Sequence, residues 1–128
     1  MTVSGIKSPF NDPEIAFAVR IGAPLSAAEL DPIELTILDS MTSKHRRSQF
    51  SSGRAAAREA LSAAGMKEPQ PILQGQRGEP VWPAGWIGSI AHTSEVAVAA
   101  VSAAGRRDGL RGVGVDIEIA LRSIRPDL

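Results

Sequence analysis

The sequence lacks cysteine and long hydrophobic runs. Without cysteine, disulfide bonds and thiolate metal sites are excluded. No apolar run is long enough for a transmembrane helix, and residues 1–12 show no signal-peptide pattern. We therefore expect a cytoplasmic protein without a membrane partner.

An excess of charge of one sign is also missing, because 14 basic residues balance 14 acidic residues. A balanced charge creates no global field that would attract nucleic acid or an anionic membrane. The arginines of the central helix could still contact nucleic acid locally, but no basic patch interleaved with aromatic residues supports that hypothesis. We expect no nucleic-acid partner.

What is present is enough sequence for one domain, with 128 residues of which 43% are hydrophobic. Ser26 is a candidate cap for a helical region that Pro32 divides. The other predicted elements are a strand over 14–22, a helix over 43–64 ended by Gly65, loops over 67–85, two strands within 86–103 joined by a turn near 92–94, and a strand over 110–121. This order predicts an α+β domain in which one long helix packs on a mainly antiparallel sheet.

The predicted long helix carries a basic stripe. Arg47, Arg54 and Arg58 fall within a band about 40° wide, beside a parallel band of apolar residues. Burial of the apolar band would hold the guanidinium groups at the rim of the core, where they could bind phosphate. Ordinary solubilising charge explains the stripe equally well. Gly53 adds a second signal, because glycine inside a helix predicts close approach of a ligand or another segment.

Two acids end the stretch "GVGVDIE". On a strand, Asp116 and Glu118 share one face about 7 Å apart. Their charges would repel by about 2 kcal/mol at an effective dielectric constant near 20, unless water screens them or a cation lies between them. Mg2+ would remove this repulsion, because it takes oxygen ligands from carboxylates and phosphates. From the heptapeptide alone, a solvated edge strand is the simpler interpretation.

His92 lies at the end of a predicted strand, close to Ser89 and Thr93 in the sequence. It could donate a hydrogen bond to a phosphate, accept a proton or satisfy a buried neighbour, and the sequence leaves these roles open. We expect Trp82 and Trp86 to pack in the core or against loops, because large aromatic side chains mostly serve burial.

Three motifs follow one another in order: "RRSQFSSGRAAAREAL", "GEPVWPAGWIGSIAHT" and "GVGVDIE". From Arg46 to Glu118 the chain resembles the 4'-phosphopantetheinyl transferases of the enterobactin-synthetase component D type. Such enzymes transfer the phosphopantetheine arm of coenzyme A to a serine of an apo acyl or peptidyl carrier protein and release adenosine 3',5'-bisphosphate. The resemblance implies Mg2+ as cofactor, coenzyme A as substrate and a setting in siderophore or polyketide biosynthesis.

The resemblance also assigns roles to individual residues. Asp116 and Glu118 would be catalytic residues that hold Mg2+ on the pyrophosphate of coenzyme A. His92 would be a further catalytic residue that touches the phosphates. Arg46, Arg54 and Arg77 would bind the 3'-phosphate of the nucleotide and nearby groups. The family spacing thus selects Arg46, whereas the basic stripe selects Arg47. Arg46 lies about 80° from Arg54 around an ideal helix.

The sequence departs from the family pattern in one respect. Members of this type consist of two such halves in a pseudo-twofold arrangement, and their second half carries a "WxxKE" motif that is absent here. The 128 residues therefore resemble a single N-terminal half. We expect the activity to require a complementary second half or a homodimer. The alternative is a module that binds coenzyme A or a similar nucleotide without catalysis.

Overall fold

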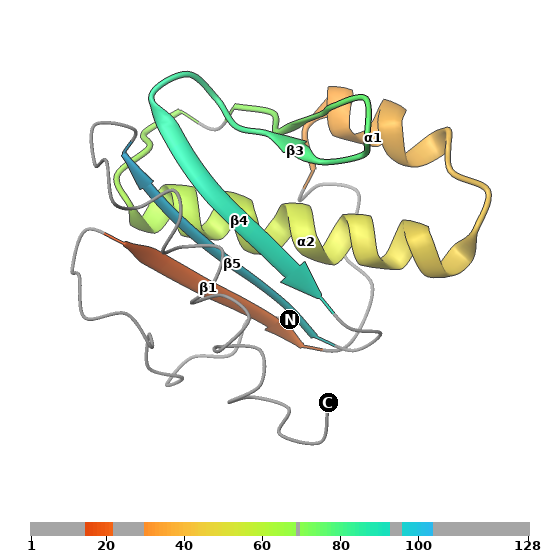
Figure 1. Ribbon diagram of the computed structural model, residues 1–128, viewed down its shortest axis with the longest axis horizontal. Helices are drawn as coiled ribbons and strands as arrows, with labels where there is room; N and C mark the ends of the chain where they lie inside the picture. Colours follow the sequence, from red (N-terminus) through yellow and green to blue (C-terminus); the bar gives the residue numbers. More distant parts are fainter. Residues whose placement is uncertain (1–14, 22–29, 69, 93–95, 104–128) are drawn as a thin grey trace.

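A three-stranded antiparallel sheet lies at the centre of the protein, with a long helix across one face (Figure 1). The computed structural model describes residues 15–21, 30–68, 70–92 and 96–103. The sheet consists of β1 (Ala16–Ile21), β4 (Trp86–His92) and β5 (Val96–Ala103), in the order β1-β5-β4. The predicted α+β class, with a helix packed on an antiparallel sheet, is confirmed.

The central strand β5 is apolar on both faces. Ala97, Ala99 and Val101 join the cluster that faces the helix, because residues two apart on a strand share a face. The alternate residues, which include Val96 and Val98, belong to a second buried cluster with Val19 of β1 and the partly buried Phe17. The run of small and β-branched residues that predicted this strand therefore reflects burial on both sides.

The long helix α2 (Lys44–Ala63) begins and ends where the sequence predicts. The side chain of Ser43 caps the N-terminus by accepting a hydrogen bond from the N–H of Arg46. At the other end, Gly65 adopts a left-handed φ of 109°. The N–H groups of Gly65 and Met66 donate to the carbonyl oxygens of Ser62 and Leu61, at 3.1 and 3.0 Å. These two bonds form the glycine-dependent C-terminal cap that Gly65 predicted.

Small side chains allow α2 to pack closely on the sheet. Ala56, Ala57 and Ala60 have no exposed surface, and Leu61 is 1% exposed. Trp82 and Trp86 pack against the edge of this cluster, as predicted for them. The helix axis can approach the strands closely because alanine contributes only one methyl group to the interface.

A shorter helix, α1 (Pro32–Asp39), precedes α2 and begins with a capping box. The side chain of Asp31 accepts from the N–H of Ile33, while the side chain of Glu34 accepts from the N–H of Asp31. Pro32 occupies the first turn, where proline is tolerated, so the predicted boundary at Pro32 is confirmed. The predicted cap, Ser26, lies outside the described residues.

A small hairpin interrupts the region that the sequence predicts as loops over 67–85. It consists of β2 (Leu73–Gln74) and β3 (Pro80–Val81), joined by a turn in which Gly78 has a φ of 83°. The prediction of loops alone was wrong here, because two-residue strands are too short to show an alternating pattern.

The predicted strand over 110–121 lies outside the described residues, and so do Asp116 and Glu118. Across the part of the chain that the structure describes, no helix combines the length and the apolar character needed to cross a membrane.

Gly88 of β4 generates a prediction about stability. A Cβ atom at Gly88 would lie 2.7 Å from Cζ2 of Trp82 and 2.8 Å from the carbonyl oxygen of Ala100. We expect Gly88→Ala to lower the free energy of unfolding by about 1–3 kcal/mol, because the indole or the strand must move. Urea denaturation measures the change. Ser89→Ala in the same strand is the control, and an equal loss in both variants would contradict this account.

Candidate functional site

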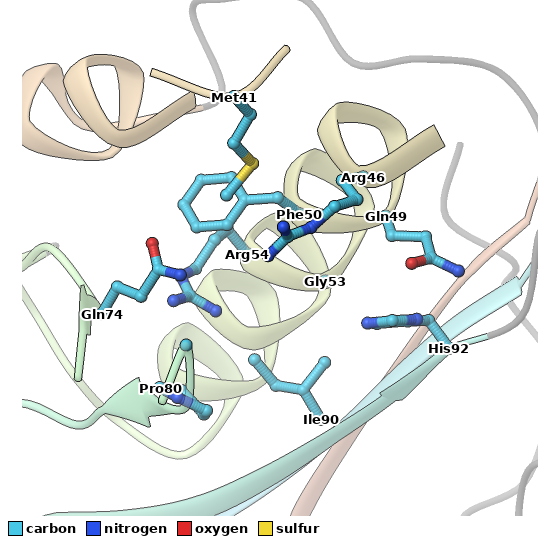
Figure 2. A pocket seen from close by; sticks show the side chains of 11 residues that line it. Met41, Arg46, Gln49, Phe50, Gly53, Arg54, Gln74, Pro80, Ile90 and His92 are labelled. Carbon is cyan, nitrogen blue, oxygen red and sulfur yellow. The ribbon is translucent and has the colours of Figure 1, made fainter. Parts of the chain in front are cut away.

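A pocket of about 220 Å3 opens between α2, the hairpin β2–β3 and the end of β4 (Figure 2). It contains three cationic or titratable side chains, two amides and no carboxylate among its lining residues. These residues are Met41, Arg46, Gln49, Phe50, Gly53, Arg54, Gln74, Gly78, Pro80, Ile90 and His92. A pocket with this lining favours an anion over a cation.

One face of α2 forms the longest wall of the pocket. Its residues follow the spacing i, i+3, i+4, i+7 and i+8, which places them on one side of a helix. They are Arg46, Gln49, Phe50, Gly53 and Arg54. This spacing includes Arg46 and excludes Arg47. The pocket therefore brings together Arg46, Arg54 and His92, three of the four nucleotide-binding residues that the family resemblance selects.

Arg54 is held firmly in the wall. It is 5% exposed, and its guanidinium lies 4.5 Å from the centre of the Phe50 ring. Its Nε donates to the carbonyl oxygen of Ile72 at 3.1 Å, and one terminal nitrogen donates to that of Leu73 at 3.2 Å. The other terminal nitrogen, Nη1, has no acceptor within the described residues. Arg54 is thus more deeply buried than the sequence predicted, since the stripe arginines were expected at the rim of the core.

Among the residues that the structure describes, no carboxylate forms an ion pair with Arg54. Burial lowers the pKa of Arg54 below its usual value, and the nearby charge of Glu34 partly offsets this effect. The carbonyl groups and the Phe50 ring solvate the cation incompletely, so an anion at Nη1 would gain a strong, charge-assisted interaction.

His92 lies opposite the helix at the end of β4, with its ring directed toward the pocket (Figure 2). A Cβ atom at Gly53 would lie 3.9 Å from Cδ2 of His92 and 3.1 Å from Cγ2 of Ile90. The close approach that Gly53 predicted is therefore made by β4. Desolvation lowers the pKa of His92 below about 6.5, a hydrogen bond with its own backbone raises it, and the charge of His45 lowers it further.

Arg46 lies at the mouth of the pocket and is exposed. It also lines an adjoining pocket of about 280 Å3, together with Gln74 and the residues that connect α1 to α2. Arg46 therefore lines both pockets. Among the described residues, no acceptor forms a hydrogen bond with its guanidinium group. Arg46 is therefore available to a ligand.

The other two arginines of the predicted stripe have structural partners. Arg47 donates to the carbonyl oxygens of Leu38 and Met41, at 2.7 and 3.2 Å, and so ties α2 to the end of α1. Arg58 donates to Oε1 of Glu34 at 2.8 Å. The interpretation of Arg47 and Arg58 as phosphate ligands is not supported, because neither residue lines the pocket and both contact α1 instead.

Arg77 lies in the exposed turn between β2 and β3, and its N–H donates to Oε1 of Glu79 at 3.3 Å. It is not among the lining residues, although its neighbour Gly78 is. Gln49 and Gln74 do line the pocket and were missed from the sequence. The helical spacing of Gln49 with Arg46 and Gly53 was the available signal for the first of them.

The described residues contain no group of three histidine or acidic side chains that could hold a metal ion. Asp116 and Glu118, the predicted Mg2+ ligands, lie outside the described ranges. Their carboxylate oxygens suit Mg2+, and the anion-favouring pocket supplies no competing carboxylate.

The two neighbouring arginines should differ in their effect on stability. We expect Arg47→Ala to lower the free energy of unfolding by about 1 kcal/mol, since two hydrogen bonds to carbonyl groups are lost. Arg46→Ala should change it by less than about 0.5 kcal/mol, because Arg46 is exposed. Chemical denaturation of both variants checks this. A larger loss for Arg46→Ala than for Arg47→Ala would contradict the assignment.

The lowered pKa of His92 makes stability depend on pH. The unfolded chain binds a proton at His92 more readily than the folded protein does, so the contribution of neutral His92 is present above about pH 6.5 and is lost as the pH falls toward the lower folded pKa. We expect His92→Gln to lose less stability than the wild type between about pH 7 and pH 5. Urea midpoints at both pH values test this, and equal losses would show that His92 does not contribute.

Comparison with known proteins agrees with the fold and the order of motifs. Residues 35–102 match the model of the 4'-phosphopantetheinyl transferase N-terminal domain family. The chain is 39% identical over 105 residues to the 4'-phosphopantetheinyl transferase PptT of Mycobacterium tuberculosis, covering 82% of this chain and 44% of that protein. It is 37% identical over 87 residues to the transferase Npt of Nocardia iowensis, covering 68% of this chain and 37% of Npt. The chain thus spans less than half the length of these relatives.

A solved structure shows the same fold. It is a holo-(acyl-carrier-protein) synthase from Bacillus anthracis in complex with CoA (3',5'-ADP), with a TM-score of 0.53 and 22% identity. The match covers 70% of this chain and 94% of that chain. Together with the matched family model and the sequence relatives, the fold shows that this chain belongs to the 4'-phosphopantetheinyl transferase family.

Proposed function

We propose that this chain forms the nucleotide-binding half of a transferase that moves the 4'-phosphopantetheine arm of coenzyme A onto a serine of an apo carrier protein. The observation that carries this proposal is the pocket in which Arg46, Arg54 and His92 meet. The partner would be an acyl or peptidyl carrier protein, of the kind used in siderophore or polyketide biosynthesis. The other product is adenosine 3',5'-bisphosphate.

The pocket residues would bind the adenosine bisphosphate part of coenzyme A. Arg54 would offer Nη1 from a fixed position, and the exposed side chain of Arg46 would contact the same phosphate from the other end of the helix face. His92 would donate a hydrogen bond to a phosphate oxygen, and its lowered pKa would rise on binding because the anion favours the protonated ring. Arg77 would contact the nucleotide from the adjacent hairpin turn.

The reaction itself needs charge neutralisation and a base. When bound, Mg2+ held by Asp116 and Glu118 would neutralise charge on the pyrophosphate. The serine oxygen forms a bond to the phosphorus that carries the pantetheine arm, and the bond from that phosphorus to the bisphosphate oxygen breaks. The serine proton requires an acceptor within hydrogen-bond reach.

The source of that acceptor is part of the proposal. The family places a "WxxKE" glutamate in its second half, and this motif does not occur in the 128 residues. We propose that a complementary second half, or a second copy of the chain, completes the active site. The relatives' greater length supports the first alternative.

Mass spectrometry tests the transfer directly. The chain, alone and with a polypeptide carrying the second half, is incubated with coenzyme A, Mg2+ and an apo carrier protein. We expect the carrier to gain the mass of the phosphopantetheine arm when the second half is present. Arg54→Gln should lower the rate at limiting coenzyme A by about tenfold or more, as expected when a charge-assisted contact is lost.

Lys67→Gln provides the control, because Lys67 is an exposed cation beyond the end of α2 and outside the pocket. It should leave the rate unchanged. If no mass gain occurs under any condition, the transferase proposal fails. Binding of coenzyme A that ignores Mg2+ and survives Asp116→Ala would then identify a non-catalytic binding module.

A further inference from the structure

Glu34 is buried completely, although it lies on α1 and outside the pocket. Its Oε1 accepts hydrogen bonds from the N–H of Asp31 at 2.9 Å and from Arg58 at 2.8 Å. Its Oε2 accepts from the N–H of Ile72 at 3.0 Å. A buried carboxylate with three donors is well satisfied, so it can fix the position of each donor.

The Ile72 contact leads from Glu34 to the pocket. The N–H of Ile72 donates to Glu34, while the carbonyl oxygen of Ile72 accepts from Nε of Arg54. The next carbonyl, that of Leu73, accepts from the second nitrogen of Arg54. Both carbonyl groups that orient Arg54 therefore belong to a segment that Glu34 anchors.

We propose that Glu34 is a positioning residue that fixes Arg54 for anion binding through the backbone of Ile72 and Leu73. That the anion is a nucleotide phosphate rests on the proposed function. The orientation of Arg54 by the two carbonyl groups does not depend on that function. Arg58 contributes by holding Oε1, and it takes no part in the contact with Ile72.

The substitution Glu34→Gln separates positioning from simple electrostatics. A glutamine amide has one acceptor oxygen and no charge. The hydrogen bond from Ile72 is therefore either lost to the NH2 group or made to a neutral oxygen, and the Ile72 anchor weakens in both orientations. Loss of a negative charge near Arg54 would by itself strengthen the attraction for a phosphate. A positioning effect therefore predicts weaker phosphate binding after Glu34→Gln, whereas a purely Coulombic effect predicts stronger binding.

The test measures affinity for adenosine 3',5'-bisphosphate by calorimetry, at a temperature where circular dichroism shows every variant folded. We expect Glu34→Gln to weaken binding about tenfold, comparable to the loss of one charge-assisted hydrogen bond. Glu59→Gln is the charge-matched control, because Glu59 lies on α2 with its carboxylate 3.9 Å from Arg20 and is not among the pocket residues, and it should change affinity by less than about twofold. In an Arg54→Gln background, Glu34→Gln should have no further effect on affinity.

NMR of the ligand-free protein decides the positioning claim independently. The Nε–H signal of Arg54 should be resolved and protected from exchange in the wild type and in Glu59→Gln, and broadened or lost in Glu34→Gln. A protected signal in Glu34→Gln, or an affinity that is unchanged or increased, would overturn the inference. If the wild type does not bind the nucleotide, the proposed function fails, while the Arg54 signal still tests the role of Glu34.

Discussion

The close packing of α2 on the sheet is the constraint on which the site depends. The alanines of α2 bring the helix backbone near β5, and Gly53 continues this approach toward Ile90 of β4. The pocket lies beside this contact, and Arg54 of the helix and His92 of the strand both line it. The packing of α2 on the sheet thus positions the two elements that carry these side chains.

Much of this arrangement could be predicted from the sequence. Ser43 and Gly65 mark the ends of α2, and the apolar runs predict β4 and β5. The family resemblance selects Arg46, and the helical spacing from Arg46 to Arg54 places both residues on the helix face that lines the pocket. These features are local or periodic, so they leave a signal in one sequence.

The remaining features depend on contacts between distant segments. Arg47, Arg54 and Arg58 look alike in the sequence, yet of the three only Arg54 lines the pocket. Arg47 and Arg58 instead contact α1, through Leu38 and Glu34. The capping box of Asp31 and Glu34 is local, but the contact of Glu34 with Ile72 spans 38 residues and has no sequence signature. The short hairpin β2–β3 is likewise stabilised by its surroundings more than by its own pattern.

The central claim is that an incompletely solvated buried cation, Arg54, forms the fixed part of a phosphate site. A crystal structure of the chain with adenosine 3',5'-bisphosphate tests it most directly. The account predicts a phosphate within hydrogen-bond distance of Nη1 of Arg54, with the carbonyl contacts of Nε retained. A bound nucleotide that leaves Arg54 and His92 without contact to phosphate would contradict it.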